Sequence, residues 1–172
     1  MSAVIGFARA LFVSSALVAM GCGPSQPAVA PPSSKSSLLG APAPTFKREA
    51  VDGRDVSVAT PGKVVVVKFV AKYCEPCVRT LPAIEKLHEQ RPEIDIVGVS
   101  EDESASEARE LVATYHLTFP VVHDNQQVLA ARYRVSDLPV TFVLDGKGNV
   151  AWVGGPDKSE SDLVAAIERA KP

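Results

Sequence analysis

The residues of this chain best suited to chemistry are two cysteines in the run Cys74-Glu75-Pro76-Cys77. They lie between a strand-like apolar run, residues 64–71, and apolar positions at helical spacing, so we expect them at a helix N-terminus. Unpaired N–H groups and the helix dipole stabilise a thiolate there. The thiolate is the attacking species in disulfide exchange, and Cys77, one turn along, could resolve a mixed disulfide on Cys74. The pattern therefore predicts redox chemistry.

Two other uses of a cysteine pair fit the sequence less well. A zinc site needs four ligands, but the chain has no second cysteine pair, and His88, His116 and His123 show no ligand spacing. A purely structural disulfide that closes so short a loop would add little stability. We therefore expect neither a metal nor another cofactor.

The composition excludes several classes of protein. The chain has 172 residues, of which 46% are hydrophobic and 22% are charged, with a net charge of −2. These values predict one domain with appendages, and they exclude a wholly disordered chain and a multi-span membrane protein. The net charge gives no reason to expect nucleic-acid binding.

The first 44 residues are expected to lie outside the folded domain. Residues 1–21 read as an export signal, because an apolar stretch too short to span a bilayer follows Arg9. The signal ends in Gly21-Cys22, which resembles a bacterial lipoprotein box and predicts a lipid on Cys22. Ordinary cleavage near residues 28–30, or a free thiol at Cys22, are the alternatives. Residues 22–44 are rich in proline and serine and predict an extended tether, which leaves residues 45–172 as the domain.

The domain is expected to be α/β, with strands and helices that alternate around the cysteines. We expect a leading hairpin over residues 45–58 and buried strands over 64–71 and 94–100. Pro82 should kink the helix that follows the cysteines. Further helices are expected over 104–115 and 126–133, a second hairpin over 140–153, and a closing helix after a capping box at 159–162.

From about residue 44 to 170 the chain resembles the thioredoxin-like superfamily, and more closely its exported TlpA-like and ResA-like thiol-disulfide oxidoreductases. The resemblance rests on the leading hairpin, on residues 68–77 with the Glu75-Pro76 dipeptide, on Pro82, and on residues 96–100 and 135–142. It implies a mixed central sheet flanked by helices, with an added N-terminal β-hairpin. It also implies that Pro139 is a cis-proline packed against the disulfide, and that the Leu138 backbone pairs with the incoming peptide.

The chain departs from this family at three positions near the cysteines. Tyr73 replaces the usual tryptophan, and Thr80 stands where ResA-like proteins carry a glutamate. Lys68 stands where thioredoxin has a buried carboxylate. The usual proton acceptors for Cys77 are therefore missing. Glu75 is the nearest carboxylate in sequence, but its position between the cysteines is normally exposed to solvent.

Lys68 shares a strand face with Val66 and Val70, which predicts an ammonium group beneath the cysteines. A nearby cation would lower the pKa of Cys74 and make the couple more oxidising. The alternative is that Lys68 extends to solvent. The run Glu101-Asp102-Glu103 is expected to be the acidic start of a helix, or an acidic patch for a partner.

We therefore expect a lipid-anchored, periplasm-facing thiol-disulfide oxidoreductase, soluble in the periplasm if Cys22 carries no lipid. We expect it to reduce the disulfides of exported clients rather than to oxidise their thiols, for instance in cytochrome c maturation, and we expect a membrane electron donor to recharge it. One alternative is a peroxiredoxin-like peroxidase, but the proline and threonine of that family are absent before Cys74. A Sco-like copper chaperone is another, but such proteins space their cysteines three residues apart.

Overall fold

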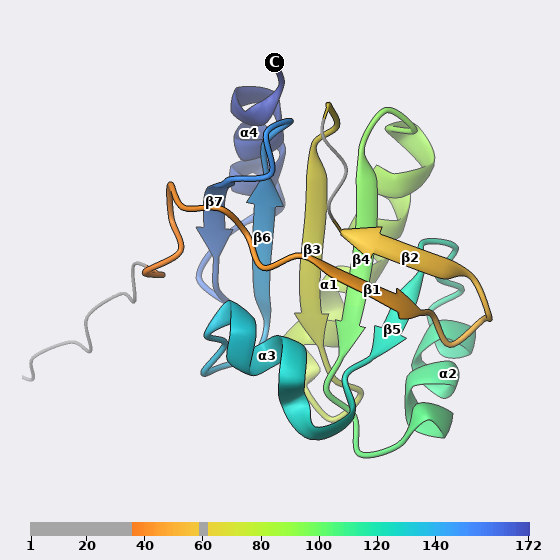
Figure 1. The fold of residues 1–172 in the computed structure, drawn as a ribbon. Coiled ribbons are helices and arrows are strands. Elements are labelled where there is room, and N and C mark those ends of the chain that lie inside the picture. The colour runs from red at the N-terminus through yellow and green to blue at the C-terminus, as the bar shows by residue number, and fades with distance from the viewer. Residues whose placement is uncertain (1–35, 59–61) are drawn as a thin grey trace, which may run out of the picture. The chain divides into compact units, whose positions relative to one another are not determined.

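The computed structural model describes residues 36–58 and 62–172, and a five-stranded mixed sheet forms its centre (Figure 1). The strand order is β5-β4-β3-β6-β7. β3 and β4, and β4 and β5, pair in parallel, whereas β3 and β6, and β6 and β7, pair antiparallel. The strands are β3 (Val65–Val70), β4 (Asp95–Ser100), β5 (Val121–His123), β6 (Val140–Leu144) and β7 (Val150–Gly154).

The central strand β3 positions the cysteines. All six of its residues are buried, as expected of an apolar strand covered on both faces. The chain leaves the end of β3 and reaches Cys74 four residues after Val70, and helix α1 (Glu75–Gln90) begins at the next residue. α1 then runs unbroken across Pro82.

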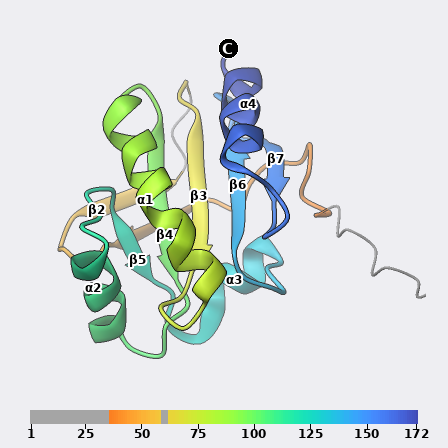
Figure 2. The same ribbon diagram turned by 180° about the vertical axis from the view of Figure 1, so that it is seen from behind.

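Helices α1, α2 (Ala105–Thr114) and α4 (Glu160–Ala170) pack on one face of the sheet (Figure 2). Leu81 and Ile84 of α1 and Ile167 of α4 are buried against Val66 and Val143 of the sheet. Both α2 and α4 begin with a capping box, in which a serine and an acidic side chain satisfy backbone N–H groups reciprocally. The predicted box at 159–162 is therefore confirmed.

The opposite face of the sheet is covered by α3 (Val128–Tyr133) and by a separate hairpin of β1 (Phe46–Glu49) and β2 (Asp55–Val58) (Figure 1). Its core is aromatic: the Tyr133 ring lies 5.3 Å from that of Phe69 and 5.0 Å from that of Phe142. The turn between β1 and β2 contains Gly53 at a φ of 87°, a conformation that glycine adopts without strain. The expected mixed sheet and its N-terminal hairpin are thus confirmed.

The prediction of one helix over residues 126–133 is wrong at its start. Gln126 and Gln127 have φ angles of 65° and 56°, so a short 3-10 turn, η1 (Asn125–Gln127), precedes α3. The buried carboxylate of Asp124 accepts hydrogen bonds from the N–H groups of Leu129 and Ala130 at 2.9 and 2.8 Å. This long-reaching cap satisfies the first turn of α3 and sets where the helix begins.

Within residues 36–58 and 62–172, no helix combines the length and the apolar character needed to cross a membrane.

Candidate active site

Cys74 and Cys77 form a disulfide at the N-terminus of α1, with their Cα atoms 5.2 Å apart. Cys74 is the N-cap residue, and its sulfur accepts a hydrogen bond from the Cys77 N–H at 3.2 Å. Cys74 is 8% exposed, whereas Cys77 is fully buried. An incoming thiolate or disulfide can therefore reach only the sulfur of Cys74, and the helix N-terminus would stabilise negative charge on it.

The loop that precedes β6 lies beside the disulfide. The Leu138–Pro139 peptide bond is cis, as predicted. Pro139 is buried and Leu138 is half-buried. Leu138 lines a surface hollow together with Cys74 and Tyr73.

The side chains that flank the cysteines differ in solvent exposure and in their hydrogen bonds. Tyr73 is 71% exposed, and partial burial together with nearby carboxylates raises the pKa of its phenol. Glu75 is also exposed and lies 3.9 Å from Arg79 in an ion pair one helical turn along. Thr80 donates a hydrogen bond to the Cys77 carbonyl oxygen at 2.7 Å. Neither Glu75 nor Thr80 therefore replaces a buried carboxylate beneath the cysteines.

Lys68 occupies the middle of β3 and is only 3% exposed, so its ammonium does not extend into bulk solvent. Its neighbours on this strand face, Val66 and Val70, belong to the same packed cluster as Cys74 and Cys77. Burial lowers the pKa of Lys68 from 10.5 to about 8. No hydrogen bond or ion pair offsets that burial within the described residues. A charge without a partner therefore lies on the side of the sheet that carries the disulfide.

Lys68 lines a cleft of about 370 Å³ together with Pro76 and Pro139. Of the predicted site residues, Tyr73, Cys74 and Leu138 line the hollow and Lys68, Pro76 and Pro139 line the cleft, whereas Glu75 and Cys77 line neither. The predicted lipidation site, Cys22, lies outside the described residues.

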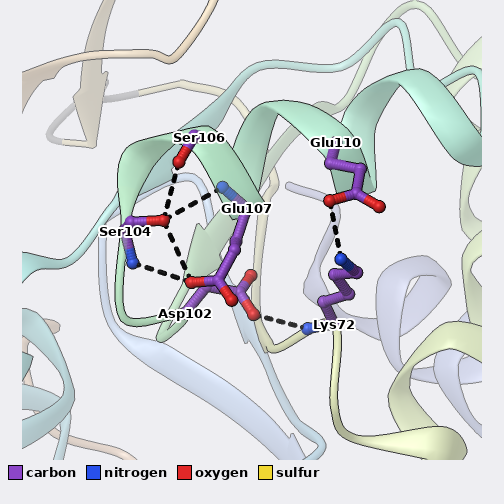
Figure 3. Close-up of polar contacts among 6 residues, drawn as sticks. All are labelled: Lys72, Asp102, Ser104, Ser106, Glu107 and Glu110. Atoms are coloured by element: carbon purple, nitrogen blue, oxygen red, sulfur yellow. Dashed lines mark hydrogen bonds and ion pairs between the residues drawn. The ribbon is translucent and has the colours of Figure 1, made fainter.

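Asp102 is a site residue that the sequence analysis did not identify. The residue is 5% exposed, and its carboxylate accepts hydrogen bonds from the Lys72 N–H at 2.7 Å (Figure 3) and from the Ser100 hydroxyl at 2.8 Å. The Lys72 ammonium is paired with Glu110 of α2 at 2.6 Å (Figure 3). These contacts attach the segment just before Tyr73 and Cys74 to the end of β4.

The acidic run 101–103 therefore does not start a helix. Helix α2 begins later, with Ser104 as its N-cap and Glu107 closing the capping box (Figure 3). Asp102 instead supports the cysteine loop. The available signal was topological: the run follows a strand parallel to β3, so both strands end at the same edge of the sheet.

Glu101, which the sequence placed only in the acidic run 101–103, lies in the same hollow as Cys74. Its Oε1 atom is buried without a hydrogen-bond partner among the described residues. Burial, and secondly the charge of Asp124, raises the pKa of this carboxyl group. The hollow also contains Asp137 and no lysine or arginine, so its charged side chains are all acidic.

The comparisons with known proteins agree with this geometry. Residues 39–153 match the model of the AhpC/TSA family. The chain is 36% identical over 130 residues to the thioredoxin-like protein YneN of Bacillus subtilis, covering 72% of this chain and 76% of the relative. It is 31% identical to the thiol-disulfide oxidoreductase ResA of the same organism, covering 77% of this chain and 76% of that one.

A solved structure shares the fold. The thiol:disulfide interchange protein of Chlorobium tepidum superposes with a TM-score of 0.67 at 26% identity, over 75% of this chain and 94% of its own. Together with the disulfide at the start of α1, these likenesses place the chain among the thioredoxin-like enzymes. The chain belongs to the AhpC/TSA family and is a thiol-disulfide oxidoreductase related to the ResA proteins.

Proposed function

We propose that this protein reduces disulfides of exported client proteins, with Cys74 as the nucleophile and Cys77 as the resolving thiol. The Cys74 thiolate attacks one sulfur of the client disulfide, which forms a mixed disulfide and releases one client thiolate. Cys77, as thiolate, then attacks the Cys74 sulfur, which forms the enzyme disulfide and releases the second client thiolate. Two electrons pass to the client, and a membrane dithiol donor returns them to the enzyme.

The observation that carries these roles is the unequal exposure of the two cysteine residues. Cys74 is 8% exposed at the helix N-terminus, and Cys77 is completely buried. A client sulfur can approach the former, while the latter is held within reach of a mixed disulfide. Leu138, in the same hollow as Cys74, offers its backbone to the client peptide.

Lys68 is proposed to tune the couple. A cation close to a thiolate lowers the pKa of the thiol, typically by about 1–3 units for a pair at short range. The burial of Lys68 strengthens such an interaction, because water screens it little. Lys68 would therefore make the dithiol a weaker reductant than the same site with a buried carboxylate.

Export and lipid attachment at Cys22 complete the proposal. Residues 1–21 would be removed, the lipid on Cys22 would hold the enzyme at the membrane, and the residues from Cys22 to about residue 37 would tether the domain above it. The predicted tether is too long at its end, because Leu38 and Ala43 are buried in the domain and the N–H groups of Gly40 and Ala43 bond to the Val150 and Gly148 carbonyls. Haem-attachment cysteines of c-type cytochromes are the candidate clients. Mass spectrometry of the mature protein checks the anchor, because Cys22→Ser should remove the lipid mass and release the protein from membranes.

The thiol roles are tested with the full-length chain carrying Cys22→Ser, so that only the two active-site cysteines remain. Cys74→Ser should abolish reduction of a disulfide-containing peptide. Cys77→Ser should accumulate one mixed disulfide per chain, which dithiothreitol cleaves. The reverse pattern, in which Cys77 carries the peptide, would contradict the assignment. Rapid turnover of hydrogen peroxide, or tight binding of Cu(I) that His123→Ala weakens, would instead support the peroxidase or the copper chaperone.

A further inference from the structure

The cleft beside Pro76 and Pro139 is basic. Of its charged lining residues, Lys68, Arg79 and Lys158 are cationic and only Glu160 is anionic. Arg79 and Lys158 have exposed acidic neighbours, Glu75 at 3.9 Å and Asp157 at 2.7 Å. Exposed pairs of this kind hold their partners weakly, so both cations remain available at the rim.

Lys68 differs from the buried carboxylates of the domain, each of which has hydrogen-bond donors. Glu85 accepts from the Thr118 N–H at 2.8 Å, Asp102 from the Lys72 N–H, and Asp124 from two N–H groups of α3. The Lys68 ammonium has no such partner in the described part of the chain. Because Lys68 lines the cleft and no carboxylate among the described residues pairs with it there, a negative group that enters the cleft would meet an unpaired cation.

The walls of the cleft are apolar. Trp152 of β7, Ile84 of α1 and Leu163 of α4 line it together with Lys68. The first turn of α4 adds little, because the Ser159 hydroxyl already accepts the Asp162 N–H in the capping box. The cleft therefore fits a carboxylate on a short hydrocarbon stem, with the charge at Lys68.

We propose that this cleft binds the carboxylate of an aspartate or glutamate side chain of the client, close in its sequence to the cysteine under attack. The proposal rests on the proposed function and names a specificity determinant for it. Pro76 lies between the two cysteines in the first turn of α1, and Pro139 lies in the loop just before β6, so a client residue beside the reacting cysteine can reach the cleft. Charge complementarity with Lys68, supported at the rim by Arg79 and Lys158, selects the acidic residue.

The only tryptophan of the chain, Trp152, lines the cleft and reports its occupancy. The oxidised full-length chain carrying Cys22→Ser is titrated with hexanoate and, as the matched neutral probe, with hexanamide, while tryptophan fluorescence is recorded. Hexanoate should produce a saturable change and bind about tenfold more tightly than hexanamide, as a charged contact predicts. Equal binding of the two probes would overturn the proposal without any variant.

Two lysine variants test whether hexanoate binds beside Lys68. Lys68→Met should weaken hexanoate binding by about tenfold, and Lys86→Met, an exposed lysine on α1, should leave it unchanged. Binding should also weaken as the pH rises above about 8, where Lys68 loses its proton. The other charged groups of the lining are Arg79, Lys158 and Glu160, and pairing with Asp157 raises the pKa of Lys158, so Lys68 titrates before Lys158. Unchanged affinity in Lys68→Met would refute the site.

A second assay tests whether the cleft recognises an acidic side chain of a client peptide or binds only a free carboxylate. Two disulfide peptides that differ only in a glutamate or a glutamine beside the cysteine are reduced by the enzyme, and their kcat/KM values are compared. The glutamate peptide should be preferred about tenfold, and Lys68→Met should abolish the preference. Hexanoate binding without peptide discrimination would overturn the client assignment. The fluorescence assay involves no turnover. If hexanoate does not bind, the proposed thiol chemistry is not affected. If the thiols are inactive, the binding result still tests the cleft.

Discussion

The two hollows that adjoin the disulfide loop carry opposite charge. Among the described residues, the charged side chains of the cleft that contains Lys68 are three cations and Glu160, whereas those of the hollow that contains Cys74 are Glu101 and Asp137. Lys68 has no hydrogen bond or ion pair within the described residues, and the Glu101 Oε1 atom is buried without a hydrogen-bond partner there. The comparison predicts that Lys68 and Glu101 shift the pKa of Cys74 in opposite directions.

The largest expected effect is on stability, from Lys68→Met. The pKa of Lys68 is about 8 in the folded protein and 10.5 in the reference state, so burial destabilises the charged form by about 3 kcal/mol. The penalty is fully present below pH 8 and disappears as the pH rises towards 10.5, because the unfolded chain then loses the same proton. Lys68→Met should therefore raise the free energy of unfolding by about 3 kcal/mol at neutral pH. Urea unfolding of both oxidised proteins across pH measures the difference, and a destabilised variant would show that Lys68 has a partner after all.

Substitution of Asp102 should change the stability in the opposite direction, because each oxygen of its buried carboxylate accepts a hydrogen bond. Asp102→Ala would leave the Lys72 N–H and the Ser100 hydroxyl without their acceptor, and should destabilise the protein by about 2 kcal/mol. Urea unfolding at neutral pH measures it. Asp137→Ala, at an exposed position in the hollow beside Cys74, provides the control. Equal effects of the two substitutions would contradict the assigned role of Asp102.

Much of this architecture could be predicted because its signals are local. The cysteine spacing, the all-apolar central strand, the serine-led capping boxes and the cis-proline loop each occupy a few neighbouring residues. Asp102 could not be identified in that way, since its role depends on an N–H group 30 residues earlier in the chain. The start of α3 escaped prediction for a related reason: Asp124 caps it from five and six residues away.

Lys68 illustrates a second limit of the sequence. Alternation along β3 places its side chain on the face that carries the cysteines, but the same pattern allows a long side chain to reach solvent. Only the packing of α1 and α4 over that face makes it 3% exposed. Its burial is thus a tertiary effect, like the burial of the Glu101 Oε1 atom at the end of β4.

A smaller effect is expected on the thiol itself. Lys68→Met should raise the pKa of Cys74 in the reduced enzyme by about one unit, because the variant loses the cation that favours the thiolate. The pH dependence of Cys74 alkylation by iodoacetamide measures this pKa. Lys86→Met serves as the matched surface variant and should behave like the unmodified chain. A Cys74 pKa that stays the same or falls would remove Lys68 from the active site.

Glu101→Gln should produce the smallest shift, and in the opposite direction. The Glu101 carboxylate shares a hollow with Cys74, so its ionised form disfavours the thiolate. Glu101 is partly open to solvent, which screens the effect, and we expect the pKa of Cys74 to fall by about half a unit. The same alkylation profile reports it. If the pKa of Cys74 shifted in the same direction in the Lys68 and Glu101 variants, the opposite effects assigned to the two hollows would be contradicted.

The most direct test of the account is the midpoint potential of the Cys74–Cys77 couple in the full-length chain carrying Cys22→Ser, with and without Lys68→Met. Each is equilibrated against defined ratios of reduced and oxidised dithiothreitol or glutathione. The account predicts one reversible two-electron couple, and a potential about 30 mV more negative in Lys68→Met for each unit by which the thiol pKa rises. A couple that does not titrate reversibly, or a potential that is unchanged or more positive in the variant, would contradict it.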